Sequence, residues 1–317
     1  MMPPAHTEYR KGLHEVADGV HAWLAPDGGW GRSNAGLIEG DGATLLVDTL
    51  FDLPMTREML TAMAPVTDRS PLRYAVNTHA NGDHCYGNSL LPASTVIHAG
   101  PHFDDDLHEV PPALLAQLMT AELGPVLGPY LRRNFGAYRF ADIAVRGADV
   151  TVTGPTVLDV GGRSVEVLPL GPAHTRGDVV VWVPESRTLF AGDLLFIGGT
   201  PMMWSGPIGN WVAACDHMLA LEPATVVPGH GPVTGPAGIR QVRDYLTFLD
   251  GYARSSLAAG RSWREAAAEV DLGPYAAWGE SERTVANLYG AYRSLEPATE
   301  EITLLDLLTA MAAWDRT

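Results

Sequence analysis

The sequence predicts a mixed α/β fold. Short apolar runs of strand length recur along the chain, as in residues 43–48, 72–76 and 179–183. Longer segments with the spacing of amphipathic helices follow or separate them, as in residues 210–221 and 235–259. The chain has 317 residues, 46% of them hydrophobic, which is enough for one large domain or two small ones with a substantial core.

In the first part of the chain, strands alternate with one clear helix. Strands are expected at residues 19–24, 33–38, 43–48, 72–76 and 94–98. The helix should span residues 54–63, with Asp52 or Thr56 available as its N-cap. Residues 101–146 differ in character and read as a helical insertion. There we expect one helix after Pro111, a break at residues 124–129, and a second helix over residues 130–135.

The second part continues with strands and ends in helices. Strands are expected at residues 150–152, 156–160, 163–170, 179–183, 188–191 and 225–228, with a glycine turn at residues 161–162. Residues 194–207 are apolar but interrupted by glycine and proline, so we expect a loop. Helices are expected at residues 210–221, 235–259, 262–270, 280–294 and 302–314. The helix at 262 should begin with a capping box formed by Ser262 and Glu265.

The chemistry of the chain is concentrated directly after the strand at residues 72–76. Within six residues the sequence offers His79, Asn81, Asp83 and His84, with glycines that mark a turn. Nitrogen and oxygen donors of this kind suit zinc or a similar first-row ion. A nearby carboxylate, Asp48, ends another strand and is expected to accept backbone hydrogen bonds beneath this loop.

Three more strands end in a residue that can bind metal. His174 follows the strand at 163–170, Asp193 follows the strand at 188–191, and His230 follows the strand at 225–228. Each one alone is typical of an ordinary turn. Together with the first stretch they predict one metal site built from several strand ends.

This set of residues resembles the signature of the metallo-β-lactamase superfamily, His-x-His-x-Asp-His followed by His, Asp and His. The resemblance runs from about residue 16 to residue 232 and implies a four-layer αββα sandwich. It implies that residues 1–235 form the catalytic core, with the insertion at about 101–146. Residues 236–317 would be a helical C-terminal extension packed on the same domain. This extension either packs over the core, covers the cleft or forms the contact of a homodimer.

Carried over position by position, the resemblance assigns two metal sites. His79 and His174 match the first site, while Asp83, His84 and His230 match the second. Asp193 matches the carboxylate that bridges both sites.

Asn81 stands where the superfamily has its second histidine. A carboxamide oxygen is a much poorer zinc ligand than an imidazole, so the second site should fill first. The other should be weak, empty or occupied by a different metal. The cofactor is therefore expected to be one or two zinc ions, with iron or manganese as alternatives. Asn81 would either bind metal, stabilise its loop, or donate a hydrogen bond to an oxyanion in the reaction.

Composition excludes several classes of partner. The formal charge of −16 argues against nucleic acid, whose phosphates need clustered lysine and arginine. No apolar run is long enough to cross a bilayer, and no signal peptide is visible, so a cytoplasmic protein is expected. Lys11 is the only lysine, which argues against lysine-based covalent catalysis. The expected partner is a small-molecule substrate.

The resemblance implies a metal-dependent hydrolase. Metal-bound hydroxide would attack the carbonyl of a small-molecule ester, thioester, lactone or amide, with Asp83 orienting it. Trp30, Met203 and Trp204 are the expected substrate-pocket residues. One alternative is a metal-dependent cyclase of aromatic polyketide biosynthesis, a subgroup to which the stretches at residues 28–30 and 198–204 are similar. A second alternative is a metal-poor binding protein that has lost turnover through Asn81.

Replacing Asn81 with histidine is expected to raise occupancy of the first metal site, because imidazole replaces a weak ligand. Elemental analysis of the purified wild-type and Asn81→His proteins would measure this as metal ions per chain. An unchanged stoichiometry would count against our explanation of Asn81.

Overall fold

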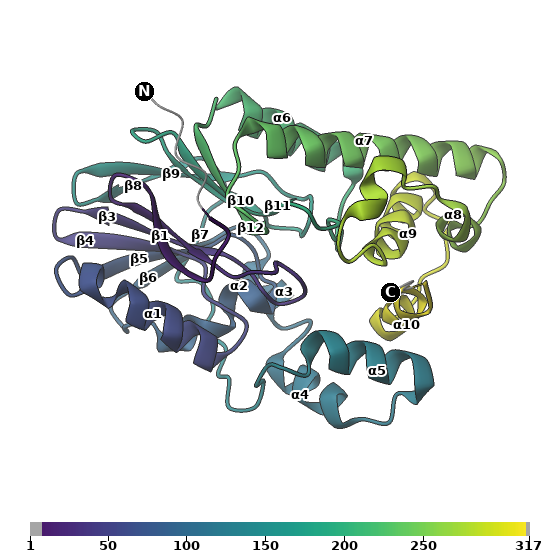
Figure 1. Ribbon diagram of the computed structural model, residues 1–317, viewed down its shortest axis with the longest axis horizontal. Helices are drawn as coiled ribbons and strands as arrows, with labels where there is room; N and C mark the ends of the chain where they lie inside the picture. Colours follow the sequence, from purple (N-terminus) through teal and green to yellow (C-terminus); the bar gives the residue numbers. More distant parts are fainter. Residues whose placement is uncertain (1–7, 315–317) are drawn as a thin grey trace.

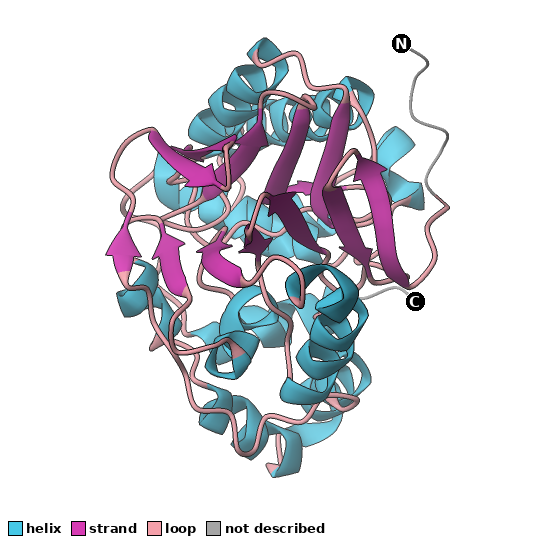
Figure 2. Ribbon diagram, turned by 90° about the vertical axis from the view of Figure 1, so that its left-hand side faces the viewer, coloured by secondary structure: helices cyan, strands magenta, loops and turns pink. Residues whose placement is uncertain are grey.

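The computed structural model describes residues 8–314 and contains two β-sheets packed face to face between helices (Figures 1 and 2). The first sheet has the strand order β1-β2-β3-β4-β5-β6-β7. Its strands are β1 (Gly12–Ala17), β2 (Val20–Leu24), β3 (Ala35–Gly40), β4 (Ala43–Val47), β5 (Leu72–Asn77), β6 (Val96–Ala99) and β7 (Val150–Thr151). The strands from β1 to β4 pair antiparallel, and those from β4 to β7 pair parallel.

The second sheet has the order β12-β11-β10-β9-β8. Its strands are β8 (Thr156–Val160), β9 (Arg163–Pro169), β10 (Val179–Val183), β11 (Thr188–Phe196) and β12 (Thr225–His230). Only β11 and β12 are parallel, so their carboxyl ends meet at one edge, which brings Phe196 opposite His230. This edge is where the predicted ligands of β11 and β12 lie.

Valine and other branched side chains fill the space between the sheets. Ile38, Leu45 and Val76 of the first sheet pack in one cluster with Val165 and Val181 of the second. Every residue of β4 and β10 is buried, because each strand also has a covered outer face. This explains why both appear in the sequence as continuous apolar runs and do not alternate.

Helices cover the outer faces of both sheets. Helix α1 (Leu53–Thr67) packs Met59 and Met63 against the first sheet, and Asp52 caps its N-terminus by accepting from Met55 N at 2.9 Å. Helices α6 (Ile208–Ala220) and α7 (Pro236–Ala258) lie together on the second sheet (Figure 1). The predicted αββα sandwich is thereby confirmed.

Further helices gather at one end of the sandwich. Two short helices follow β5: α2 (Gly82–Cys85) and the 3₁₀ helix η1 (Tyr86–Leu90). The insertion contains α3 (Phe103–Leu107), α4 (Pro112–Thr120) and α5 (Gly124–Phe135). The C-terminal region contains α8 (Trp263–Glu269), the 3₁₀ helix η2 (Gly273–Ala277), α9 (Arg283–Leu295) and α10 (Leu304–Trp314). Ser262 and Glu265 form the predicted capping box of α8. Helix α10 packs on both α5 and α9, so it joins the insertion to the C-terminal extension (Figure 1).

Two of the element predictions need correction. The expected break at residues 124–129 is wrong, because α5 runs through it. Pro125 lies in the first turn, where a backbone N–H would have no partner within the helix, so its absence costs nothing. Pro129 lies inside the helix and removes one backbone hydrogen bond, but the burial of Tyr130 and Phe135 stabilises the helix. The loop expected from residue 194 begins later, since β11 continues to Phe196 in parallel pairing with β12.

Strand β1 and the short helix α3 were not predicted. The division at residue 235 stays a prediction, although α7 packs on α6 and β11 of the core. Within residues 8–314, no helix combines the length and apolar character that crossing a bilayer requires.

Candidate metal centre

The six predicted ligands meet at one end of the two sheets. They are His79, Asp83, His84, His174, Asp193 and His230. His79 follows β5, and Asp83 and His84 lie on α2. His174 lies in the loop between β9 and β10, Asp193 belongs to β11, and His230 ends β12. Residues separated by up to 151 positions in sequence, from His79 to His230, therefore share one buried place.

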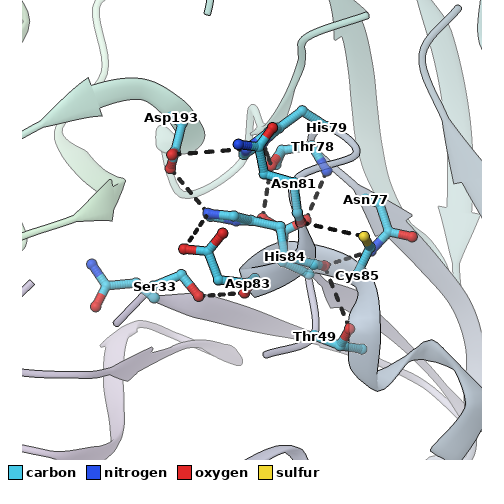
Figure 3. A network of polar contacts seen from close by, with 12 residues as sticks. Ser33, Thr49, Asn77, Thr78, His79, Asn81, Asp83, His84, Cys85 and Asp193 are labelled. Atoms are coloured by element: carbon cyan, nitrogen blue, oxygen red, sulfur yellow. Dashed lines mark hydrogen bonds and ion pairs between the residues drawn. The ribbon is translucent and has the colours of Figure 1, made fainter. Parts of the chain in front are cut away.

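Asp193 lies at the centre of this group. Its Oδ1 is 3.0 Å from His84 Nε2, and its Oδ2 is 3.3 Å from His230 Nε2. The same Oδ2 is 3.5 Å from His174 Nε2 and 3.8 Å from His79 Nε2. Figure 3 shows the Asp193 carboxylate facing the His84 ring, with Asp83 on the other side of that ring nitrogen. Four imidazoles thus turn the same nitrogen toward one carboxylate.

Asp83 adds a second carboxylate to the centre. Its Oδ2 lies 3.3 Å from His230 Nε2 and 3.8 Å from His84 Nε2. Asp83, His84 and His230 form one triad with ligand atoms close enough to share a cation, and His79, His84 and Asp193 form another. The assignment of the ligands to two separate sites stays a prediction, since His84 belongs to both triads.

Backbone carbonyls orient two of the rings. His174 Nδ1 donates to the carbonyl of Met202, and His230 Nδ1 donates to that of Gly28 at 3.1 Å. A carbonyl oxygen can only accept, so each Nδ1 must carry a hydrogen. When the ring is neutral, its Nε2 therefore presents a lone pair to the centre, as a metal ligand requires.

Asp48 and Thr78 orient the other two rings. His84 Nδ1 donates to Asp48 Oδ2 at 2.9 Å, and the Thr78 hydroxyl donates to the same oxygen at 2.8 Å. Since that hydroxyl has one hydrogen, it accepts from His79 Nδ1 at 3.0 Å. Asp48 also accepts from Thr78 N at 2.7 Å, which confirms its predicted structural role beneath the loop. It holds a left-handed backbone conformation with φ of 62°, which is uncommon outside glycine and fixes the carboxylate in place.

Several inward-facing atoms approach an opposite charge but make no hydrogen bond within the protein. Nε2 of His79, His84 and His174 and Oδ1 of Asp193 are buried and make no hydrogen bond. Buried polar atoms without a partner are costly and uncommon in native structures. One or two divalent cations would satisfy all of them at once, so the donor set fits the metal that the sequence implies.

The titration of the rings also suits a cation site. Burial lowers the pKa of His174 to about 4 and holds the pKa of His79 well below its usual value, so both rings are neutral at pH 7. Burial acts in the same direction on His84 and His230, but Asp193 and its neighbours outweigh it. They raise the pKa of His230 to about 9 and that of His84 well above its usual value. The centre thus attracts positive charge, and metal binding there releases protons.

Two glycines let the strands approach this centre. A Cβ at Gly229 would lie 2.0 Å from Asp193 Oδ1, and one at Gly192 would lie 2.6 Å from the Thr78 Cβ. Gly192 also has a φ of 51°. Both positions therefore need glycine, and each one directly precedes a predicted ligand in the sequence.

A cavity of about 600 Å³ opens onto the centre. Asn81, Asp83, His174, Asp193 and His230 line its floor. The insertion and the C-terminal helices supply much of its apolar wall, through Leu115, Leu118, Met119, Leu131, Phe135, Leu304 and Leu308. The cavity is therefore polar at the centre and apolar along its helical wall.

The predicted pocket residues agree with this cavity in part. Trp30 and Trp204 line it. Met203 does not, which corrects its assignment: it is buried against Gly290, where a Cβ would lie 2.6 Å from its Cε, and Met202 faces the cavity instead. In an irregular loop, the sequence alone does not reveal which of two adjacent methionines faces the cavity. Sequence reasoning also missed Arg283, which lines the cavity from α9.

The comparison with known families agrees with this geometry. The pattern of the metallo-beta-lactamase superfamily matches residues 28–230, which include all six predicted ligands. The chain belongs to this superfamily. Members of this superfamily are typically dependent on two metal ions.

The curated relatives are distant. The 2,4-dinitroanisole O-demethylase subunit alpha of Nocardioides sp. (strain JS1661) is 25% identical over 235 residues, which are 72% of this chain and 58% of that protein. An acyl-coenzyme A thioesterase of Bos taurus is 26% identical over 220 residues, covering 63% of this chain and 73% of that one. A hydroxyacylglutathione hydrolase of Methylococcus capsulatus is 27% identical over 191 residues, which are 59% of this chain and 57% of that protein. The chain thus spans little more than half the length of the first of these relatives.

Solved structures share the fold. The sec-alkylsulfatase Pisa1 from Pseudomonas sp. superposes with a TM-score of 0.67 at 18% identity, covering 92% of this chain and 52% of that one. The metallo-β-lactamase DIM-1 superposes with a TM-score of 0.55 at 20% identity in one structure, covering 76% of this chain and 99% of its own.

Replacing Asp48 with asparagine is expected to weaken zinc binding by about 10- to 100-fold, because the charged partner of His84 Nδ1 is lost. Competition with a chromogenic zinc chelator would measure the affinity. Asp68→Asn, on the exposed end of α1, is the matched control and should bind zinc like the wild type. Equal affinity in all three proteins would contradict the orienting role of Asp48.

Proposed function

We propose that this protein hydrolyses a small-molecule ester, thioester, lactone or amide by attack of water at the carbonyl carbon. The observation that carries the proposal is the convergence of four imidazole Nε2 atoms on Asp193 at 3.0 to 3.8 Å, beside a cavity large enough for a small molecule. The names of two relatives, a hydroxyacylglutathione hydrolase and an acyl-coenzyme A thioesterase, support acyl compounds as the substrate class.

The cofactor would be one or two divalent cations. Imidazole and carboxylate donors favour zinc, with iron or manganese as alternatives. His79, His84, His174, His230 and the two aspartates would hold the ions. A bound cation supplies Lewis acidity and lowers the pKa of water toward neutrality.

Two residues of the chain would act on the substrate directly. Asp83 lies at the cavity floor, where its carboxylate would orient the attacking water and take up a proton. Asn81 lines the same floor, and its side chain does not cap the helix that it precedes. Its carboxamide N–H would donate to the carbonyl oxygen as negative charge develops there.

The cavity wall limits what can enter. The apolar side chains of the insertion and of α10 would exclude water around the scissile bond and pack against an apolar part of the substrate. A small-molecule substrate, with no role for nucleic acid or membrane, remains our proposal. The polyketide cyclase alternative rests on the glycine-rich stretches of the sequence alone. The binding-protein alternative is disfavoured by the intact ring of inward-facing imidazoles.

A panel of nitrophenyl esters, a thioester, a lactone and an anilide should reveal hydrolysis by the zinc-loaded protein, and chelation should abolish it. Asp83→Asn is expected to lower kcat/KM by about 100- to 10,000-fold, because the group that accepts the proton is lost. Initial rates followed by absorbance would measure this.

Asp216→Asn, an exposed change on α6, serves as the control and should retain the wild-type rate. If the zinc-loaded wild type cleaves no member of the panel, or if Asp83→Asn cleaves at the wild-type rate, the proposal fails.

A further inference from the structure

Arg283, in the first turn of α9, is a fully buried arginine on the wall of the cavity. Only 1% of it is exposed, yet it lines the cavity together with residues of the metal centre. Arginine is almost never buried to this degree unless a partner balances its charge. The question is therefore what partner this guanidinium has.

The protein itself satisfies few of the hydrogen-bond donors of this guanidinium. Nη1 of Arg283 donates to the carbonyl of Thr200 at 3.1 Å, while Nε is buried and makes no hydrogen bond. Among residues 8–314, no carboxylate forms an ion pair with this guanidinium. A guanidinium has five N–H donors, so most of its capacity for hydrogen bonding is unused. Leaving a buried charge unpaired is costly.

Two acidic side chains directly precede Arg283. Glu280 interacts with it electrostatically without forming an ion pair, and Glu282, the N-cap residue, is engaged elsewhere. Glu282 Oε1 accepts from Trp30 Nε1 and from the Tyr130 hydroxyl, both at 3.0 Å. These bonds hold the Trp30 ring, whose centroid lies 4.2 Å from Arg283 Cζ. Glu282 thus fixes the Trp30 ring against which the guanidinium lies, while Nε of Arg283 stays without a hydrogen bond.

Arg283 also lies close to the metal centre. Its Cζ is 5.3 Å from the ring centroid of Phe196, and that ring stacks on His230 at 4.9 Å with an interplanar angle of 2°. A single aromatic ring therefore separates the guanidinium from a predicted metal ligand. A substrate bound at the centre would reach Arg283 within the length of a small molecule.

The other arginine on the cavity wall is already paired. Arg176 donates to Asp106 at 2.6 Å and to Glu109 at 2.8 Å, and all three lie at the cavity wall. Arg176 is also partly exposed, in contrast to Arg283. This leaves Arg283 as the arginine of the wall with donors to offer a ligand.

We propose that Arg283 determines specificity by pairing with a carboxylate of the substrate. The substrate would then be an acyl compound that carries a free carboxylate besides its scissile bond, joined by an apolar portion that packs on the helical wall. Planar bidentate pairing with a carboxylate is the geometry that arginine favours. A single negative charge also suits a cavity that already holds Asp83 and Asp193. The inference rests on the hydrolase function proposed above.

A matched pair of substrates tests this. The mono-nitrophenyl ester of adipic acid carries a free carboxylate, and its methyl ester masks that charge at nearly the same length. The zinc-loaded wild type should favour the free acid in kcat/KM by about tenfold or more, through a lower KM. In Arg283→Met this ratio should fall to near one, and in Arg283→Lys it should be intermediate.

The ratio of kcat/KM for the free acid to that for the methyl ester does not depend on the fraction of folded protein, because both substrates are assayed with the same protein preparation. Arg293→Met, which removes an arginine of the same helix outside the cavity, is the control and should keep the wild-type ratio. A wild type that prefers the methyl ester, or an Arg283→Met ratio equal to that of the wild type, would overturn the proposal.

A binding measurement separates this inference from the proposed hydrolysis. The probe phenylhexanoate is the anion of 6-phenylhexanoic acid, which has a free carboxylate and no ester bond to cleave. The alcohol 6-phenylhexanol is its uncharged counterpart. Calorimetry should detect tighter binding of phenylhexanoate to the wild type, with the difference lost in Arg283→Met. That result without any ester cleavage would keep the carboxylate site and reject the hydrolase function. Equal binding of phenylhexanoate to both proteins would reject the carboxylate site.

Discussion

The structure depends on one arrangement: hydrogen bonds on the outer nitrogens of four imidazole rings, which turn the inner nitrogens toward Asp193. Each of these outer bonds ends on a protein oxygen, from Asp48, Thr78 or a backbone carbonyl. The rings are thus oriented before any ligand arrives. Orientation in advance lowers the entropy cost of binding a cation and sets which tautomer faces it. The fold can be understood as the scaffold that supplies these outer partners.

Both sheets contribute to that scaffold. The ends of β5 in one sheet and of β11 and β12 in the other meet at one edge, and Gly192 and Gly229 allow the backbones to close around Asp193. The valine-rich interface between the sheets fixes their relative position, so predicted ligands from both sheets can meet at one place. The insertion and α10 then build an apolar wall over this edge. Placing the polar groups at the floor and apolar helices above them would keep bulk water away from the proposed reaction.

Much of this could be predicted from the sequence, for a physical reason. A buried strand leaves a clear pattern, and a residue able to bind metal directly after it leaves another, so the coincidence of both predicted that His174, Asp193 and His230 would lie together. The outer partners could not be predicted in the same way, because a backbone carbonyl such as that of Met202 has no residue type of its own. The continuation of α5 through Pro129 and the inward turn of Met202 depend on tertiary packing. Arg283 lies more than 50 residues beyond the last ligand, and only the folded chain brings it to the cavity.

The most direct test of this account is X-ray diffraction from crystals of the zinc-soaked protein, recorded on both sides of the zinc absorption edge. The account predicts one or two anomalous peaks beside Asp193, each about 2.0 to 2.2 Å from imidazole Nε2 atoms and carboxylate oxygens. Peaks located elsewhere, or rings that bind zinc through Nδ1 with their outer hydrogen bonds broken, would contradict it.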